Sequence, residues 1–335
     1  MTQTLNGATV LVTGGAGFIG SALVRALLAD GATVRVVDNL INGKRANLEE
    51  VLGERATLYA DDIRDAERMS ALMAGVDVVF HLACLGVRHS IHSPLENHEV
   101  NATATLHLLG IARSAGVNRF VYVSSSEVYG TAKTVPMTEL HPTYPMTVYG
   151  ASKLAGECYT RAYYETYGYE TVVVRPFNSY GMRSHHEGDS GEVIPKFLLR
   201  SMAGKPMVIF GDGTQTRDFT FVTDTARGIL LAGISPAAVG QTINLGSNYE
   251  ITISELAEKV KAVVGNPNAE VIHDEPRPGD VLRLYADSRK AGELLGFEAQ
   301  VPLEEGLRQL KAWYESLNVP LEDLLTQEKV RNWEA

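Results

Sequence analysis

Tyr149 and Lys153 are the pair of residues whose types and spacing indicate chemistry most directly. Four residues make about one turn of a helix, so the two side chains are expected to share a helix face. There the Lys153 ammonium would stabilise a phenolate at Tyr149 and lower the pKa of the tyrosine toward working pH. The pair is therefore a candidate acid/base couple, although tyrosine and lysine also meet at this spacing on many exposed helices.

A glycine-rich turn near the start of the chain indicates a cofactor that such a couple would serve. Gly14, Gly17 and Gly20 follow an apolar β-type run over 8–13 and precede an amphipathic helical pattern. The missing side chains allow a tight turn, close approach of a pyrophosphate and packing of the helix on the strand. The start of the helix then offers free N–H groups to phosphate. The turn therefore predicts a dinucleotide site.

Asp38 discriminates between the possible dinucleotides. It ends a second strand-like run, 33–37, at about the spacing expected for a ribose-binding carboxylate. A carboxylate that accepts from both ribose hydroxyls would repel a 2′-phosphate, and the following residues, Asn39 and Leu40, bring no cation. The sequence therefore predicts NAD rather than NADP. The alternative for Asp38 is a solvated carboxylate at a strand end.

Composition and charge are those of a globular enzyme. The chain has 335 residues, of which 45% are hydrophobic and 21% charged, so it can bury a core in two domains or one large α/β unit. Its net charge of −10 argues against a nucleic-acid partner, which would usually leave a basic footprint. No apolar stretch approaches the roughly 20 residues that span a bilayer, and no basic segment followed by an apolar run opens the chain. We expect no membrane partner and a cytoplasmic location.

The cysteines and the paired histidines do not indicate a metal site. Cys84 and Cys158 are isolated from each other, so neither a disulfide framework nor a zinc site is predicted. Both are expected to be small buried hydrophobic residues. His185 and His186 lack companions at ligand spacing. We therefore predict no metal.

The elements that must position these residues alternate along the first half of the chain. Strand-like runs are expected at 8–13, 33–37, 56–60, 77–82, 118–124 and 170–175, and helical patterns at 18–30, 65–74, 94–116 and 148–168. This alternation predicts the α/β class, with a Rossmann-type, doubly wound parallel sheet covered by helices on both faces.

The regular alternation of strands and helices ends after Pro176. A polar, glycine-bearing loop over 183–192 is followed by short strands and by helices near 223–233, 252–264 and 287–295. We expect an NAD-binding domain over 1–176 to which 215–245 returns, and a smaller C-terminal portion over 177–319 that mainly binds substrate. A helical tail is expected over 320–335.

These motifs together carry a family resemblance that runs from about residue 8 to 315. They are, in chain order, the segments 13–20, 61–65 and 81–83, Asn101, the segment 124–130, Tyr149 with Lys153, and the segment 175–178. The set resembles the extended short-chain dehydrogenase/reductases of the NAD-dependent nucleotide-sugar epimerase/dehydratase family.

The resemblance implies a role for each matching residue. Ser125 would hydrogen-bond the reacting sugar hydroxyl, Tyr149 would be the base, and Lys153 would be its electrostatic partner and a ribose ligand. Tyr129, which no lysine follows four residues later, is expected to pack structurally. The cofactor-binding residues implied are Gly14, Gly17, Phe18, Ile19, Gly20, Asp38, Asn39, Asp62, Ile63, Leu82, Ala83, Asn101, Tyr149, Lys153 and Pro176.

The chemistry follows from the base and the cofactor. A phenolate that removes the C4 hydroxyl proton lets hydride leave C4 for the nicotinamide ring, which gives a 4-ketosugar. The ketone acidifies the C5 proton, which a carboxylate beside the ring can abstract while a second proton donor assists loss of the C6 hydroxyl. Glu127 is the candidate C5 base, with Ser126 or a water near it. The run Ser125-Ser126-Glu127 resembles the one in the family's 4,6-dehydratases and UDP-glucuronate decarboxylases, and this resemblance favours 4,6-dehydration. Local capping or pairing is the alternative for Glu127.

Other reactions of the same family stay open. The alternatives are a nucleotide-sugar 4-epimerase acting on a UDP-hexose or UDP-uronate, and a UDP-glucuronate decarboxylase. A remoter alternative is a non-catalytic protein that senses NAD.

The resemblance implies a nucleotide diphosphate sugar as the substrate, and its paired phosphates would suit fixed guanidinium groups. The candidate substrate-binding residues are Arg88, Ser125, Asn178, Arg183, Phe210, Arg217, Arg277 and Asp280, with Phe210 bordering the nucleobase. The helices over 98–116 and 148–168 are candidates for a homodimer interface, although an intramolecular core would account for their tyrosines nearly as well.

Overall fold

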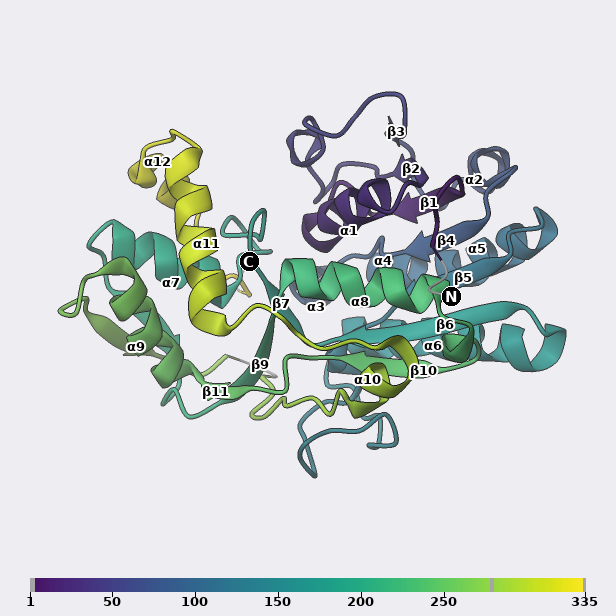
Figure 1. Ribbon diagram of the computed structural model, residues 1–335. Coiled ribbons are helices and arrows are strands. Elements are labelled where there is room, and N and C mark those ends of the chain that lie inside the picture. The colour runs from purple at the N-terminus through teal and green to yellow at the C-terminus, as the bar shows by residue number, and fades with distance from the viewer. Residues whose placement is uncertain (1–3, 278–279, 334–335) are drawn as a thin grey trace.

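A seven-stranded, all-parallel sheet forms the larger part of the molecule (Figure 1). The computed structural model describes residues 4–277 and 280–333. The strands are β1 (Thr9–Thr13), β2 (Thr33–Val37), β3 (Ala56–Tyr59), β4 (Val78–His81), β5 (Arg119–Val123), β6 (Glu170–Pro176) and β10 (Thr242–Leu245). Their order is β10-β6-β5-β4-β1-β2-β3, so the winding reverses between β1 and β4. In such sheets the ligand crevice lies at this reversal, outside the carboxyl ends of the strands.

Helices cover both faces of this sheet, as the alternating sequence pattern predicts. On one face α1 (Phe18–Ala29) packs against α8 (Val222–Ile234), and on the other α2 (Ala66–Met73) and α6 (Val148–Tyr167) pack against α5 (Ala104–Ser114). Every residue of β4 and β5 is buried, which is typical of parallel strands covered on both sides.

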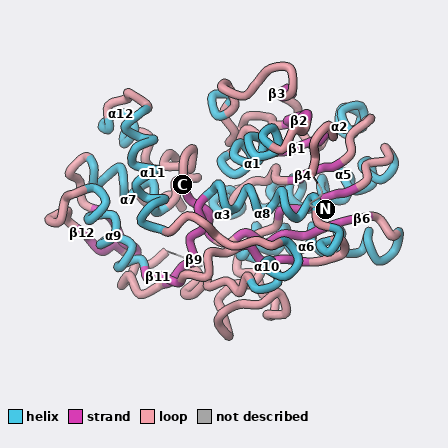
Figure 2. Tube along the Cα trace, viewed as in Figure 1, coloured by secondary structure: helices cyan, strands magenta, loops and turns pink. Residues whose placement is uncertain are grey.

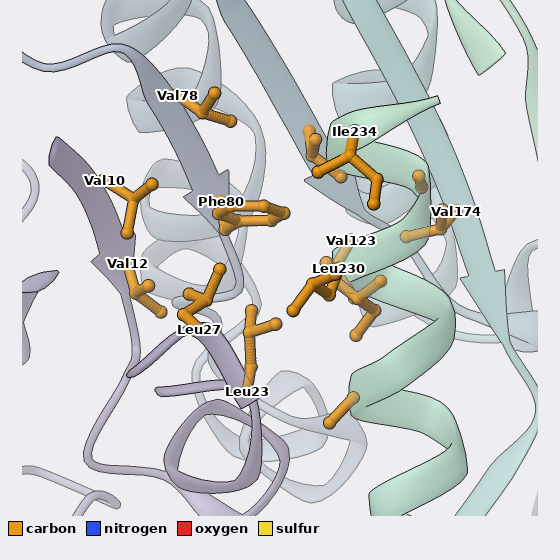
Figure 3. Close-up of a cluster of buried hydrophobic side chains, with 14 of the residues drawn as sticks. Val10, Val12, Leu23, Leu27, Val78, Phe80, Val123, Val174, Leu230 and Ile234 are labelled. Carbon is orange, nitrogen blue, oxygen red and sulfur yellow. The ribbon is translucent and has the colours of Figure 1, made fainter. Parts of the chain in front are cut away.

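A hydrophobic core between the large sheet and the helices α1 and α8 holds these elements together. Phe80 of β4 lies between Leu23 and Leu27 of α1 and Leu230 and Ile234 of α8 (Figure 3). All five side chains are at most 9% exposed. Burying a side chain of this size contributes about 1.5–3 kcal/mol.

A smaller lobe contains the remaining sheets and four helices. The three-stranded sheet has the order β11 (Glu250–Thr252), β9 (Thr216–Phe221), β7 (Asn178–Tyr180), and β8 (Met207–Phe210) pairs with β12 (Val271–Asp274). Figure 2 shows α7 (Val193–Met202), α9 (Ile253–Val264), α11 (Leu303–Ser316) and α12 (Leu321–Thr326) gathered around them. A hydrophobic cluster separate from that of the large sheet joins these elements.

Short elements complete the described fold. They are α3 (Val87–His92), α4 (Pro94–His98), α10 (Arg289–Leu295), a π-helical turn over Glu99–Thr103, and 3₁₀ turns over Arg45–Asn47, Ser126–Val128 and Pro236–Ala238. No helix in the described parts of the chain is both long and apolar enough to cross a membrane.

The structure differs from the sequence expectations in three places. The helix expected over 94–116 is divided by the wider π turn into α4 and α5. Helix α7 was not predicted; its Pro195 lies in the first turn, where proline is tolerated. The C-terminal helix ends at Thr326, and residues 327–333 form bends and turns instead of the expected helical tail.

The segment 215–245 divides between the two lobes. Helix α8 and strand β10 join the large sheet, whereas β9 pairs with β7 and β11 in the smaller lobe. The chain therefore crosses between the lobes at Phe221, where β9 ends and α8 begins.

Candidate active site

The turn between β1 and α1 forms a cradle for a ligand, and only glycine fits at two positions in it, Gly14 and Gly20. Gly14 has φ +69°, and a Cβ there would lie 2.7 Å from the backbone nitrogen of Ala83. A Cβ on Gly20 would lie 2.1 Å from the carbonyl oxygen of Gly14. Both positions require the missing side chain, and α1 begins directly after Gly17 without a side-chain cap. The backbone surface and free helix N–H groups fit a dinucleotide pyrophosphate.

Asp38 lies at the end of β2 with its carboxylate buried. It accepts hydrogen bonds from the backbone nitrogens of Ala16 and Leu40, both at 2.9 Å. Burial raises the pKa of Asp38, and these two hydrogen bonds act against the rise. The side chain borders the same cavity as Gly14, so a carboxylate faces the space where a ribose is expected. These residues fit NAD.

Asn39 and Asp62 lie together at the edge of the cavity. The Asn39 side chain donates to Asp62 Oδ2 at 3.1 Å, and Arg64 pairs with the same carboxylate at 2.7 Å. The hydrogen bond from Arg64 lowers the pKa of Asp62 to about 2. Ile63 is buried beside them and, like them, borders the cavity.

A buried polar network fixes the loop after β4. The backbone nitrogens of Leu82 and Ala83 both donate to Thr13 Oγ1 at 3.2 Å, and Thr13 Oγ1 lies 2.7 Å from His81 Nδ1. Asn101 Oδ1 accepts from the backbone nitrogen of Leu85 at 2.8 Å. Leu82 and Ala83 line the cavity, whereas Asn101 lies behind it and holds the loop.

One cavity of about 700 Å³ runs from this cradle to the smaller lobe. Sequence-predicted residues that line it are Gly14, Gly17, Phe18, Ile19, Gly20, Asp38, Asn39, Asp62, Ile63, Leu82, Ala83, Arg88, Ser125, Glu127, Tyr149, Lys153, Pro176, Asn178, Phe210, Arg217, Arg277 and Asp280. Asn101, Ser126 and Arg183 do not line it. The structure thus brings together most of the predicted residues, which lie up to 266 positions apart in the sequence, from Gly14 to Asp280.

Helix α6 carries the acid/base pair, as the four-residue spacing predicts. The Thr147 side chain caps the helix by accepting from the backbone nitrogen of Gly150 at 3.1 Å, which fixes Tyr149 in the first turn. Burial raises the pKa of Tyr149, the charge of Cys84 adds to the rise, and a hydrogen bond with Ser125 lowers it. In the protein alone the tyrosine is therefore a neutral acid.

Lys153 lies one turn further along, only 2% exposed. Its Nζ donates to the backbone carbonyl of Val123 at 2.8 Å and lies 5.1 Å from the centre of the Tyr122 ring. The ammonium is held by a carbonyl and a ring face, and no carboxylate among the described residues pairs with it. Its charge remains available to the cavity.

Ser125 and Glu127 reach the cavity from the turn after β5. Ser125 caps the short 3₁₀ turn and accepts from the backbone nitrogen of Glu127 at 3.2 Å. Burial raises the pKa of Glu127, while Arg217 and Arg88 lower it. Ser126, by contrast, is 4% exposed and does not border the cavity.

Tyr129 has the structural role that the sequence predicts. Its hydroxyl donates to Asn244 Oδ1 and accepts from Arg175 Nη1, both at 2.7 Å. Arg175 in turn forms a two-point ion pair with the buried Glu157. The network ties β6, β10 and α6 together behind the site.

Three arginines converge on the part of the cavity in the smaller lobe. Burial lowers the pKa of Arg277 to about 10, and the like charges of Arg88 and Arg217 add to the lowering. Arg217 pairs with Asp280 at 2.7 Å. Arg277 lies 5.5 Å from the centre of the Phe210 ring, and its buried Nε has no hydrogen-bond partner among the described residues. Clustered guanidinium groups of this kind suit an anionic ligand.

Asn178 and Arg183 have different surroundings. Asn178 borders the cavity, and its buried Oδ1 has no hydrogen-bond partner among the described residues. Arg183 instead forms an ion pair with Glu50, with Arg183 Nη2 3.4 Å from Glu50 Oε2.

Cys84 and Glu192 are among the cavity residues that the sequence reasoning missed. Cys84 is half-buried beside Tyr149, so the expectation of a buried hydrophobic residue is wrong there; it is wrong for Cys158 too, which is exposed. Glu192 borders the cavity at the start of α7, and burial raises its pKa to about 7. A carboxylate that directly precedes an apolar helix is the only sequence signal for Glu192. Across the described residues, no cluster of His, Cys, Asp or Glu is arranged to hold a metal ion.

Comparisons with known proteins agree with this geometry. Residues 11–310 match the family model of GDP-mannose 4,6 dehydratase. The chain is 39% identical to a UDP-glucose 4-epimerase of Mycolicibacterium smegmatis over 302 residues, 89% of this chain and 95% of that one. It is 35% identical to UDP-glucuronic acid decarboxylase 1 of Danio rerio over 307 residues, 90% of this chain and 71% of that one.

A solved structure is also similar. The dTDP-glucose 4,6-dehydratase DesIV of Streptomyces venezuelae, crystallised with NAD bound, superposes with a TM-score of 0.86 at 35% identity. The match covers 92% of this chain and 97% of that one. The similar proteins are thus enzymes that perform three different reactions.

Proposed function

The chain belongs to the extended short-chain dehydrogenase/reductase family of NAD-dependent nucleotide-sugar epimerases, dehydratases and decarboxylases, and from this premise we propose that it is a nucleotide-sugar 4,6-dehydratase. The main support is the presence of two carboxyl groups, Glu127 and Glu192, on the cavity that holds Tyr149. Simple oxidation and reduction at C4 requires neither of them, whereas dehydration needs a base at C5 and a proton donor at C6.

The first step is oxidation at C4. Tyr149 accepts the proton of the C4 hydroxyl, and Ser125, which borders the cavity beside Tyr149, orients the C4 hydroxyl. The Lys153 ammonium would stabilise the phenolate and would be one of the residues that hold a ribose of bound NAD. Bound NAD supplies a hydride acceptor for C4 and later returns the hydride. Gly14, Gly20 and Asp38 would hold the cofactor in the orientation that this step needs.

The second step removes water from C5 and C6. The C4 ketone acidifies the C5 proton, which Glu127 accepts. The C5–C6 double bond forms as the C6–O bond breaks, and the hydroxyl leaves as water with a proton from Glu192. A carboxyl whose pKa is about 7 is protonated in a large part of the molecules at neutral pH, which suits a donor.

The anionic part of the substrate would lie in the smaller lobe. Arg88, Arg217 and Arg277 supply the positive charge for a diphosphate, and the unpartnered Asn178 Oδ1 and the Phe210 ring border the same space. Asp280, which Arg217 already contacts, is placed to accept from a ribose hydroxyl.

A 4-epimerase is the second candidate. The position of Ser126 favours it, because this residue is buried away from the cavity and supplies no proton donor beside Glu127. In an epimerase the ketone would turn within the cavity and accept hydride on its other face, and Glu127 would only shape the pocket.

Mass spectrometry of the product tests the proposal. The purified protein is incubated with NAD and a panel of UDP-, dTDP-, GDP- and CDP-sugars that includes uronates and N-acetyl sugars. A product lighter than its substrate by one water supports dehydration. A product of unchanged mass with a new retention time indicates epimerisation, and loss of CO₂ from a uronate indicates decarboxylation; either result rejects the proposed reaction.

We also propose that two copies associate through the helices beside the site. Leu95 of α4 is 80% exposed, Ile91 of α3 is 49% exposed and Leu106 of α5 is 37% exposed. Exposed apolar side chains on adjoining helices favour an interface. Part of the tyrosine-rich face of α6 is intramolecular, because Tyr159 and Tyr163 pack against the core. Sedimentation equilibrium would give the mass of a dimer.

A further inference from the structure

The last described residues form a strap across the substrate end of the cavity. We call residues 327–333 the C-terminal strap; it follows α12 without helical structure. The backbone nitrogen of Gly188 donates to the carbonyl of Gln327 at 2.8 Å, and Gly188 and Glu328 form an isolated β-bridge. Lys196 Nζ donates to the carbonyl of Lys329 at 2.7 Å. The strap is therefore attached to both the 183–192 loop and α7.

Glu328 adds an ion pair that is largely shielded from water. Its carboxylate accepts from Arg200 Nε at 2.9 Å, with exposed side-chain fractions of 6% for Glu328 and 14% for Arg200. Arg331 pairs with Asp274 at the end of β12, with Nε 2.9 Å from Oδ2. These contacts fix both halves of the strap to the smaller lobe.

Asn332 connects the strap to Arg88. The side chain is 1% exposed, and its Nδ2 donates to the carbonyls of Asp189 at 3.1 Å and Gly191 at 2.9 Å. Its Oδ1 accepts from Arg88 Nε at 3.4 Å. The amide thus spans from the 183–192 loop to a guanidinium that lines the cavity.

Trp333 connects the strap to Arg277. Its ring meets the Phe210 ring edge to face, with centroids 4.6 Å apart. The Arg277 guanidinium lies 5.4 Å from the centre of the Trp333 ring and 5.5 Å from that of Phe210. Two aromatic rings therefore hold one cavity-lining cation between them.

The strap contacts Arg88 through an amide and Arg277 through an indole ring, and both of these groups are uncharged. Arg88 and Arg277 repel each other in a buried space, and the nearby charges of Asp280 and Glu127 oppose that repulsion. A carboxylate in direct contact with either guanidinium would hold it in place but would also neutralise charge that an anionic ligand needs. An amide oxygen and an indole ring orient the guanidinium groups and leave their charge available.

We propose that Asn332 and Trp333 are positioning residues that orient Arg88 and Arg277 for the anionic part of the substrate. This rests on the proposed nucleotide-sugar substrate. It assigns the strap a role in substrate affinity and none in the binding of NAD, whose predicted ligands lie at the other end of the cavity.

The test compares substrate and cofactor affinity in strap variants. UDP-glucose is titrated into the NAD-loaded protein by calorimetry, and NAD is titrated separately as the folding control. Asn332→Ala and Trp333→Ala are each expected to weaken UDP-glucose binding about tenfold, the effect of losing one hydrogen bond or ring contact to a charged group. The affinity for NAD should stay within about twofold.

Two further variants separate positioning from mere packing. Trp333→Phe retains a ring beside Arg277 and should restore most of the affinity. Asn332→Asp retains the size of the side chain but pairs its charge with Arg88, so binding should weaken and depend less on salt. With a substrate that is turned over, KM should rise about tenfold and kcat should change less than about twofold. Glu322→Gln, a surface change on α12, is the matched control.

Each outcome decides between the possibilities. Unchanged UDP-glucose affinity in both alanine variants overturns the positioning role while leaving the proposed function intact. Tighter binding in those variants also overturns it, because it would show that the strap blocks the site. If the unchanged protein binds NAD but none of UDP-glucose, dTDP-glucose, GDP-mannose or CDP-glucose, the proposed function fails and the inference fails with it.

Discussion

Ser125, in the turn after β5, lies close enough to Tyr149, in the first turn of α6, for its hydroxyl to lower the pKa of the tyrosine. The fold thus brings the side chains of two separate elements together at the cavity. Helix capping at Thr147 and the 3₁₀ turn that begins at Ser126 fix the two side chains independently.

Tyr149→Phe should abolish C4 oxidation and leave binding intact. The phenyl ring keeps the packing, but no group remains to accept the hydroxyl proton, and general base catalysis is worth about 10²–10⁴-fold. Turnover of the substrate identified by mass spectrometry is the measurement, together with the affinity for NAD. Tyr129→Phe is the matched control, because its hydroxyl contacts Arg175 and Asn244. It should cost about 1–3 kcal/mol of stability and leave the pH profile unchanged.

Cys84→Ala should shift the pH dependence of the reaction. Burial raises the pKa of Tyr149, and the charge of Cys84 raises it further. Removing the thiol lowers that pKa, so the phenolate forms at lower pH and the rising limb of kcat/KM moves toward acid. Cys158→Ala, at an exposed position, should leave the profile in place. If the rising limb of the kcat/KM profile is unchanged or moves to higher pH in Cys84→Ala, then Cys84 does not raise the pKa of Tyr149.

Glu127→Gln should stop the reaction after oxidation. The amide has nearly the same shape but cannot accept the C5 proton, so the 4-ketosugar and reduced cofactor should accumulate. In heavy water the unchanged enzyme should exchange the C5 proton, and the variant should not. If Glu127→Gln forms the product at the normal rate, Glu127 is not the C5 base. That result would agree with an epimerase, which needs no base at C5.

Gly20→Ala should lose NAD affinity by at least about tenfold. Its Cβ would lie 2.1 Å from the Gly14 carbonyl oxygen, so the cradle would have to open. Gly53→Ala is the control, because a Cβ there meets nothing within 4 Å and the residue has no left-handed φ. Fluorescence titration with NAD measures both, and equal affinities would contradict the cradle.

The stability contributed by Glu187 should depend on pH. Glu187 pairs with Lys44 of the larger lobe and with His185 at 3.2 Å. Burial acts to raise the pKa of Glu187, but hydrogen bonds from His185 and Lys44 lower it below its ordinary 4.5, so its contribution is present above that pH and lost in acid. Burial acts to lower the pKa of His185, but Glu187 raises it above 6.5. That contribution is full below pH 6.5 and is lost as the pH rises through the raised value.

The two effects together give a measurable window. Glu187→Gln should lower the free energy of unfolding more at pH 6 than at pH 8.5, measured by urea denaturation. Glu322→Gln, which removes an exposed pair with Lys205, should show no such difference. A loss that grows toward alkaline pH would contradict the role of His185.

The sequence predicted well which residues gather around the glycine turn and Tyr149, because the signals there are local. Gly14 and Gly20 require backbone geometries that only glycine allows, Asp38 ends a strand, and Tyr149 and Lys153 are one helical turn apart. Each of these depends on neighbours within about one element, so the spacing carries the geometry.

The substrate half was predicted less completely because its geometry depends on distant segments. Ser126 was placed in the site on its position beside Ser125, but the 3₁₀ turn directs it into the core. Arg183 was expected to face the substrate and instead lies near Glu50. The contact of Trp333 with Phe210 joins positions more than a hundred residues apart, and no local pattern indicates it.

A substrate labelled with deuterium at C4 tests the central claim most directly. The label would leave C4 as hydride and return after water has been lost, when C6 is the carbon that accepts it. Dehydration should give a product that is lighter by one water and carries the deuterium at C6, located by nuclear magnetic resonance. Deuterium that remains at C4 in a product of unchanged mass would contradict dehydration.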